Sequence, residues 1–143
     1  MMYSALLIMS DELNNICRPR VTKKCFRDGY LIPDREDVRD SLESAYQMPV
    51  LSIRKGRTDS RNPDRFEVII LFANGYISKD GKRVLNYDSE ATLKQAFSDI
   101  QRETFADRDE LIENFIPGPK CSEEVWNSTI NWLRKSKLGT TIM

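Results

Sequence analysis

The chain has 143 residues, 40% of them hydrophobic and 31% charged, a balance typical of a folded domain rather than a disordered or membrane-spanning chain. Its 22 basic and 22 acidic residues cancel, so the overall basic excess of a protein that coats nucleic acid is missing. The chain has no histidine, which excludes catalytic sites built on an imidazole base and zinc sites with histidine ligands.

The first predicted element is an amphipathic helix over residues 3–17. Leu6, Met9 and Leu13 recur at helical spacing, and Pro19 ends the pattern. The apolar run at its start is too short to cross a bilayer, and no basic residues precede it as in a secretory signal. We therefore expect a cytoplasmic protein whose cysteines are free thiols.

The middle of the chain changes to the two-residue period of strands. In the segment 65–73 both alternating faces are apolar, so either helices cover both sides of this strand or a second copy of the protein covers one of them. Asn74-Gly75 and Asp80-Gly81 are typical hairpin turns. These turns predict that the strand continues into a meander.

The predicted fold class is α+β, a single domain with a small antiparallel β-meander flanked by about five helices. Asp34 and Asp107 are expected to cap the second and fourth helices. The helices are predicted at about 3–17, 34–47, 89–103, 107–116 and 122–136, and the strands at about 50–55, 65–73, 76–79 and 82–87.

Two acidic patterns could hold a divalent cation. Pro63-Asp64 followed by Asp80-Gly81-Lys82 resembles the pattern of the PD-(D/E)XK nucleases, which implies two Mg²⁺-binding acids and an assisting lysine. In that family the second acid and the lysine lie within a core strand, whereas Asp-Gly here is a turn pair. The acids of segments 34–40 and 107–113 are explained by the preference for acids at helix starts. We therefore predict no metal and no cofactor, and a Mg²⁺-dependent nuclease ranks third among the functions.

Two basic segments form a candidate nucleic-acid interface. Residues 18–27 carry five cations and no acid, and residues 54–65 carry a second group that is diluted by two aspartates. Such loops can bind phosphates, and Phe26 offers a ring on which an unpaired base could stack. A solvated loop, or a surface that docks an acidic partner, explains the same pattern. The candidate residues are Arg18, Arg20, Lys23, Lys24, Arg27, Arg54, Lys55, Arg57 and Arg61.

The sequence favours binding over catalysis. It contains no phosphate loop, dinucleotide fingerprint or metal-ligand box, and Cys25 has no base beside it to accept its proton. Trp132 is a candidate interface anchor at the edge of the last helix.

We expect a non-enzymatic interaction or accessory protein that self-associates and does not contact membranes. Few recognisable motifs in a short chain are typical of phage and viral accessory proteins. Nucleic-acid binding through the two basic segments is the alternative function.

Overall fold

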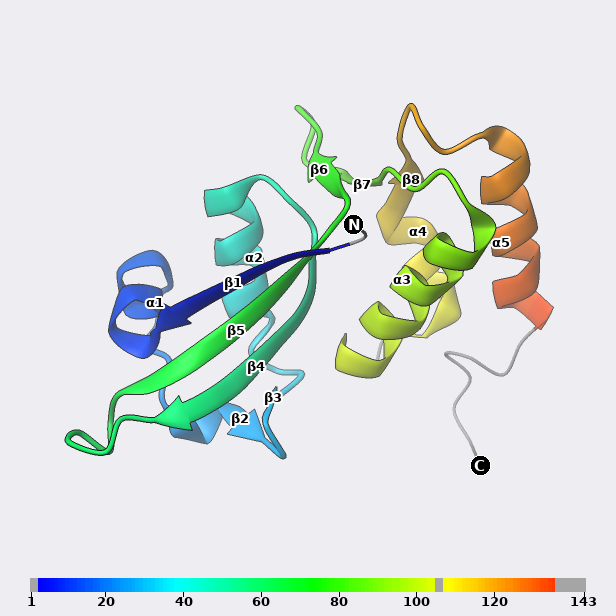
Figure 1. The fold of residues 1–143 in the computed structure, drawn as a ribbon. Helices are drawn as coiled ribbons and strands as arrows, with labels where there is room; N and C mark the ends of the chain where they lie inside the picture. The colour runs from blue at the N-terminus through cyan, green and yellow to red at the C-terminus, as the bar shows by residue number, and fades with distance from the viewer. Residues whose placement is uncertain (1–2, 105–106, 136–143) are drawn as a thin grey trace.

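Two β-sheets and five α-helices make up residues 3–104 and 107–135, the parts of the chain that the computed structural model describes (Figure 1). The α+β fold class is thereby confirmed. In chain order the elements are β1 (Tyr3–Met9), α1 (Ser10–Ile16), a 3-10 turn (Lys23–Cys25), β2 (Phe26–Arg27), β3 (Tyr30–Leu31), α2 (Glu36–Tyr46), β4 (Val50–Thr58), β5 (Phe66–Ala73), β6 (Gly75–Ile77), β7 (Arg83–Leu85), α3 (Glu90–Thr104), α4 (Arg108–Asn114), β8 (Phe115–Pro117) and α5 (Glu123–Lys135).

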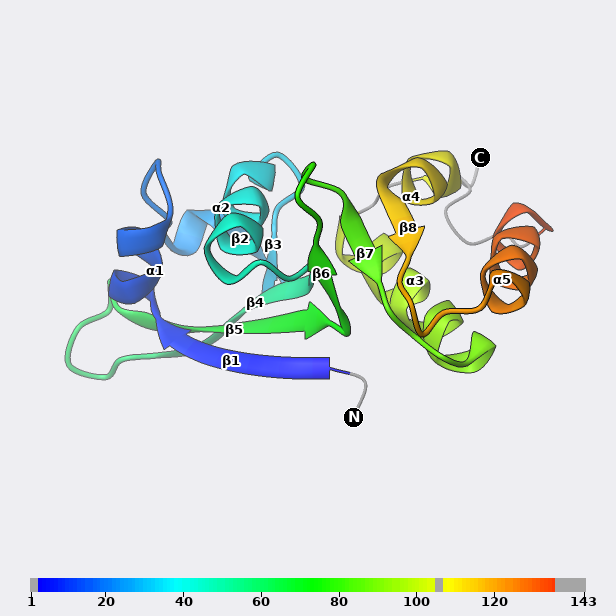
Figure 2. The ribbon, with the colours of Figure 1, turned by 90° about the horizontal axis from the view of Figure 1, so that it is seen from above.

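The larger sheet has the strand order β1-β5-β4-β3-β2, and all its neighbouring strands are antiparallel. Helices α1 and α2 cover one face, which we call the inner face (Figure 2). The inward side chains of β5, namely Phe66, Val68, Ile70 and Phe72, are buried there. Ile69 and Leu71 alternate with them on the outer face and are only half-buried. Both faces of β5 are apolar, and the structure covers one of them fully and the other in part.

The predicted helix over residues 3–17 is wrong in its first half, because Tyr3–Met9 forms strand β1 beside β5. Here the apolar run follows a two-residue period, with Ile8 buried on the inner face and Leu7 exposed on the outer one. A short apolar run fits either period, and pairing with β5 decides between them. Helix α1 begins at Ser10, whose hydroxyl accepts a hydrogen bond from the Phe66 backbone amide at 3.1 Å.

Strand β6 does not pair with β5 but belongs to a second, smaller sheet, so the predicted meander is interrupted after Ala73. The predicted hairpin of the next two strands is confirmed, because β6 and β7 pair antiparallel. Strand β6 pairs with β7, and β7 pairs in parallel with β8, which forms where the helix over 107–116 was expected to end. The backbones approach closely at Gly75, where a Cβ would lie 1.9 Å from the Val84 carbonyl oxygen. Glycine is therefore required there for the close approach of β6 to β7, not for a hairpin turn.

One predicted helix cap is confirmed and the other is wrong. The Asp107 side chain accepts a hydrogen bond from the Glu110 backbone amide at 2.9 Å. Helix α2, however, begins at Glu36, and Arg35 rather than Asp34 occupies its N-cap position, without a side-chain cap. The Arg35 guanidinium instead pairs with an acid inside the helix, Asp37.

A second apolar cluster lies where α3, α4 and α5 meet the smaller sheet (Figure 1). Its buried side chains include Phe97 from α3, Leu111 from α4 and Leu133 from α5. Leu51 and Ala73 contribute to it from the larger sheet. The molecule thus has two halves, the larger sheet with α1 and α2 and the smaller sheet with α3, α4 and α5. They are joined through the start of β4 and the end of β5.

A buried charged network adds a second connection between the halves. On α2, Arg39 donates a hydrogen bond to the Val50 carbonyl oxygen, and Glu43 accepts one from the Val50 amide at 2.9 Å. Glu43 also accepts from Nε of Arg83 in β7 at 2.7 Å. Burial lowers the pKa of the Arg39 guanidinium, and the charge of Glu43 opposes this effect. One carboxylate therefore links α2, the start of β4 and the smaller sheet.

We predict that Glu43→Gln lowers the free energy of unfolding by about 3 kcal/mol, because it removes the ion pair with Arg83 and the largest of the counter-charges acting on the buried Arg39. Asp40→Asn is the matched control, since Asp40 also pairs with Arg83 but its side chain is largely exposed. Its effect should stay below about 1 kcal/mol. Urea unfolding followed by circular dichroism measures the free energy of unfolding of both variants. Equal effects of the two substitutions would contradict a special role for the buried Glu43 carboxylate.

Candidate interaction surfaces

The first candidate surface is the open edge of the larger sheet at β1. Strand β1 has β5 on one side and is the end strand of the sheet. In an antiparallel edge strand every second residue points its backbone amide and carbonyl away from the sheet. The sequence of β1, YSALLIM, contains no charged residue and no proline. This edge therefore lacks the features that usually prevent a strand from pairing with another chain.

The outer face beside this edge is apolar and incompletely covered. Ala5, Leu7 and Met9 lie opposite Leu71, Ile69 and Glu67, respectively, in the β1–β5 register. Leu7 is 55% exposed, and Figure 2 shows no element below β1 and β5 along most of their length. Only the end of this face that includes Leu71 reaches the second apolar cluster.

The second candidate surface is the basic segment, residues 18–27. Three buried residues at four-residue intervals hold it on the protein, namely Cys17, Val21 and Cys25. The Asn14 side chain accepts from the Val21 amide at 2.6 Å and donates to its carbonyl oxygen at 3.1 Å. Arg35 donates to Sγ of Cys25 at 2.7 Å. The backbone of the basic segment is therefore fixed by side chains from α1 and from the start of α2.

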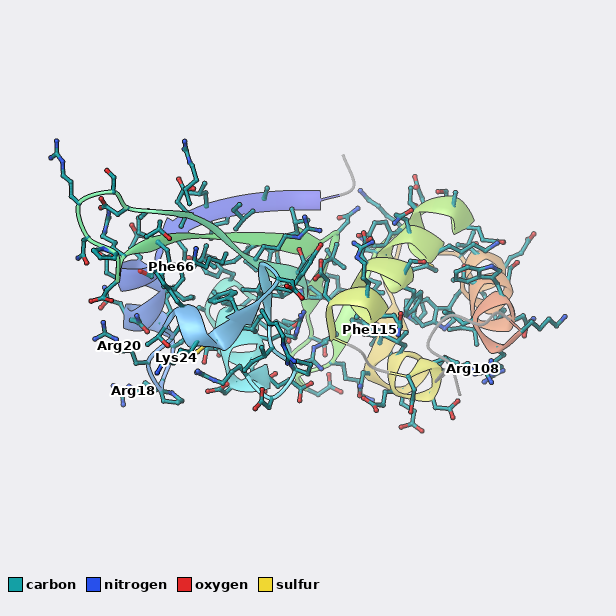
Figure 3. All side chains as sticks on the ribbon, turned by 90° about the horizontal axis from the view of Figure 1, so that it is seen from below. Arg18, Arg20, Lys24, Phe66, Arg108 and Phe115 are labelled. Atoms are coloured by element: carbon teal, nitrogen blue, oxygen red, sulfur yellow. The ribbon has the colours of Figure 1, made fainter. Side chains whose placement is uncertain are left out.

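Four of the cations of the basic segment lie between these anchors, and Arg27 follows the last of them. Each has an exposed side chain and makes no ion pair within the described residues. Figure 3 shows Arg18, Arg20 and Lys24 gathered at the end of the molecule that also holds α1. The five cations are Arg18, Arg20, Lys23, Lys24 and Arg27.

Two of the four candidate residues in the predicted second group, residues 54–65, pair with acids. Arg54 pairs with Glu103 at 3.3 Å, and Arg57 pairs with Glu67 at 3.4 Å. Lys55 donates instead to the Thr58 hydroxyl, and Arg61 is exposed. In the larger sheet β3 lies between β4 and β2, so the second group and the basic segment are not neighbours along the sheet. Within the described residues, the second group also has fewer unpaired cations than the basic segment.

Burial and pairing shift the pKa values of the two acids in this region in opposite directions. The Arg57 backbone amide and guanidinium lower the pKa of Glu67, which lies at the surface. Burial raises the pKa of Glu103, and the nearby guanidinium of Arg54 only partly offsets it. Glu103 is thus held in place by Arg54 at a cost in desolvation.

The aromatic ring expected to stack on a base has another role. Phe26 packs edge-on against Phe66 with 5.7 Å between the ring centroids, and it contacts the first apolar cluster. Tyr30, the next aromatic residue, is covered by the Arg54 guanidinium at 5.0 Å from its centroid. The basic segment therefore presents charge without an exposed aromatic platform.

A surface cavity of about 600 Å³ lies where β2 and β3 approach the end of α3. Its lining combines Tyr30 and Pro33 with two cations, Arg27 and Arg102. The sequence indicated only Arg27 among these residues, because Arg102 approaches from a helix more than seventy positions away in the chain.

The nuclease-like pattern does not form one site. Asp64 lies in the β4–β5 loop and Asp80 in the β6–β7 turn, where it accepts from the Ser78 hydroxyl. The eight residues of β5 separate them, and a strand of that length spans roughly 25 Å. Among the described residues, histidine, cysteine and acidic side chains form no cluster that could hold a metal ion.

Trp132 is half-buried against the second apolar cluster, and Nζ of Lys94 lies 5.2 Å from its ring centroid. Its predicted role as an interface anchor stays a prediction. None of the described helices is long and apolar enough to span a membrane.

Comparison with protein-family models finds no match, and comparisons with curated proteins and with solved structures find no significant similarity. Function must therefore be argued from the surfaces themselves.

The raised pKa of Glu103 predicts a defined pH dependence. Because the folded protein binds this proton more tightly than the unfolded chain, the contribution of Glu103 to stability is lost as the pH rises through its folded-state pKa. As the pH rises from 4 to 7, the free energy of unfolding of Glu103→Gln should therefore increase relative to that of the wild type. Urea unfolding at both pH values tests this, and an opposite trend would show that the Arg54 pairing outweighs burial.

Proposed function

We propose that this protein is a non-enzymatic interaction protein that self-associates by pairing β1 of one copy with β1 of a second. The observation that carries the proposal is the uncharged, unblocked β1 edge beside an exposed apolar face. Within the described residues, only Leu7 and Tyr76 are large hydrophobic side chains with high exposure, and Leu7 lies on this edge strand.

The opposite edge of the same sheet supports this choice by contrast. Strand β2 has two residues and includes the exposed Arg27, so it is short and charged in the way that protects natural sheet edges. Strand β1 has seven residues and neither feature. Of the two edges, β1 is therefore the one suited to bind another strand.

A second copy suits this edge because the strand lacks charge. In a two-fold antiparallel pair, each residue of β1 faces a residue of the same strand in the other copy. A charged strand would place like charges across this pair, but YSALLIM places none. The same pairing aligns the two outer faces, so that the apolar patches around Leu7 become continuous.

We predict that the wild-type protein dimerises reversibly and that Leu7→Lys weakens dimerisation by about tenfold or more, because two ammonium groups approach each other across the two-fold axis. Sedimentation equilibrium across a wide range of concentrations measures the association constant. Circular dichroism shows whether the variant remains folded.

Tyr76→Lys is the matched control, since Tyr76 is 41% exposed but lies on β6 in the other sheet. This variant should associate like the wild type. A wild-type protein that stays monomeric, or equal effects of the two lysine variants, would overturn the proposal.

A further inference from the structure

We propose that the basic segment, residues 18–27, binds the phosphate backbone of double-stranded nucleic acid without reading the base sequence. This inference does not depend on self-association, because the segment follows α1 and takes no part in the β1 edge. Its support is the combination of a fixed backbone with cations that make no ion pair within the described residues.

The basic segment is ordered by contacts that leave its cations outside. Buried Cys17, Val21 and Cys25 fix it at three points, and the Asn14 amide satisfies both backbone groups of Val21. Arg35 also donates to the Pro19 carbonyl oxygen at 3.3 Å. A surface held in this way loses little backbone conformational entropy when it binds a ligand, which favours affinity.

The charge of the basic segment is available for binding. Its five cations make no ion pair within the described residues, and its own sequence holds no acid. Asp28 follows it in the turn between β2 and β3 and is the first acid beyond its end. By contrast, Arg54 and Arg57 of the second basic group are paired with carboxylates. The net neutrality of the chain therefore conceals a local positive surface.

The surroundings of the segment favour a duplex over the other polyanions. Single strands are bound largely by stacking on exposed aromatic rings, and Phe26 is packed on Phe66 instead. Membrane-surface segments combine cations with exposed apolar side chains, and neither Leu7 nor Tyr76 belongs to this segment. A duplex presents phosphates on its outside and needs only charge at a fixed surface.

The test measures binding of fluorescein-labelled duplex DNA of two unrelated sequences by anisotropy at several salt concentrations. We expect both duplexes to bind equally, with an affinity that falls steeply with salt. The test variant replaces Arg18, Arg20, Lys23 and Lys24 by Gln, and it should lower the slope of log affinity against log salt by about 3 to 4.

The control variant replaces four exposed lysines outside the basic segment by Gln, so that the net charge changes equally. These lysines are Lys79, Lys82, Lys120 and Lys135. It should retain the wild-type slope, and circular dichroism verifies that both variants fold.

Four outcomes would overturn the proposal. They are the absence of binding at low salt, an equal loss in the control variant, tighter binding of single strands than of duplexes, and binding to phosphatidylserine vesicles but not to nucleic acid.

Discussion

The fold depends on one carboxylate, that of Glu43. The register of β4 against β5 shifts just after Val50, and at this point the amide and carbonyl of Val50 bond to Glu43 and Arg39 of α2. The same carboxylate receives Arg83 from the smaller sheet. Because each of the buried charges requires its partner, the helix, the irregular strand and the second sheet are fixed together. Within the described residues, no helix covers the outer face of the larger sheet along most of β1 and β5 (Figure 2).

The sequence could predict the elements in which the hydrophobic pattern has only one interpretation. The β5 pattern required a strand, and the capping pair at Asp107 marked the start of α4. The sequence could not predict β1, since an apolar run of this length fits a strand or a helix until its neighbour is known. Nor could it reveal Arg39 and Glu43 as buried, because charges at this spacing on an amphipathic helix ordinarily face water.

The candidate surfaces were predictable to different degrees. The basic segment is visible as a run of cations, but the neutralisation of the second group depends on pairs such as Arg54 and Glu103, which lie 49 positions apart. That β1 lies at an edge follows only from the strand order. The two proposals use different parts of the molecule. Two copies joined antiparallel through β1 would carry their basic segments at opposite ends of the pair, because α1 and the basic segment follow the end of β1.

The most direct test of the central claim, that β1 pairs with β1, is amide hydrogen exchange resolved by residue at low and high protein concentration. In the monomer, alternate amides of Tyr3–Met9 donate to β5 and the others face solvent. We expect the solvent-facing set to exchange more slowly as the concentration rises, while the amides of β2 stay unchanged. Dimers that form without slowing of the β1 amides would contradict the claim.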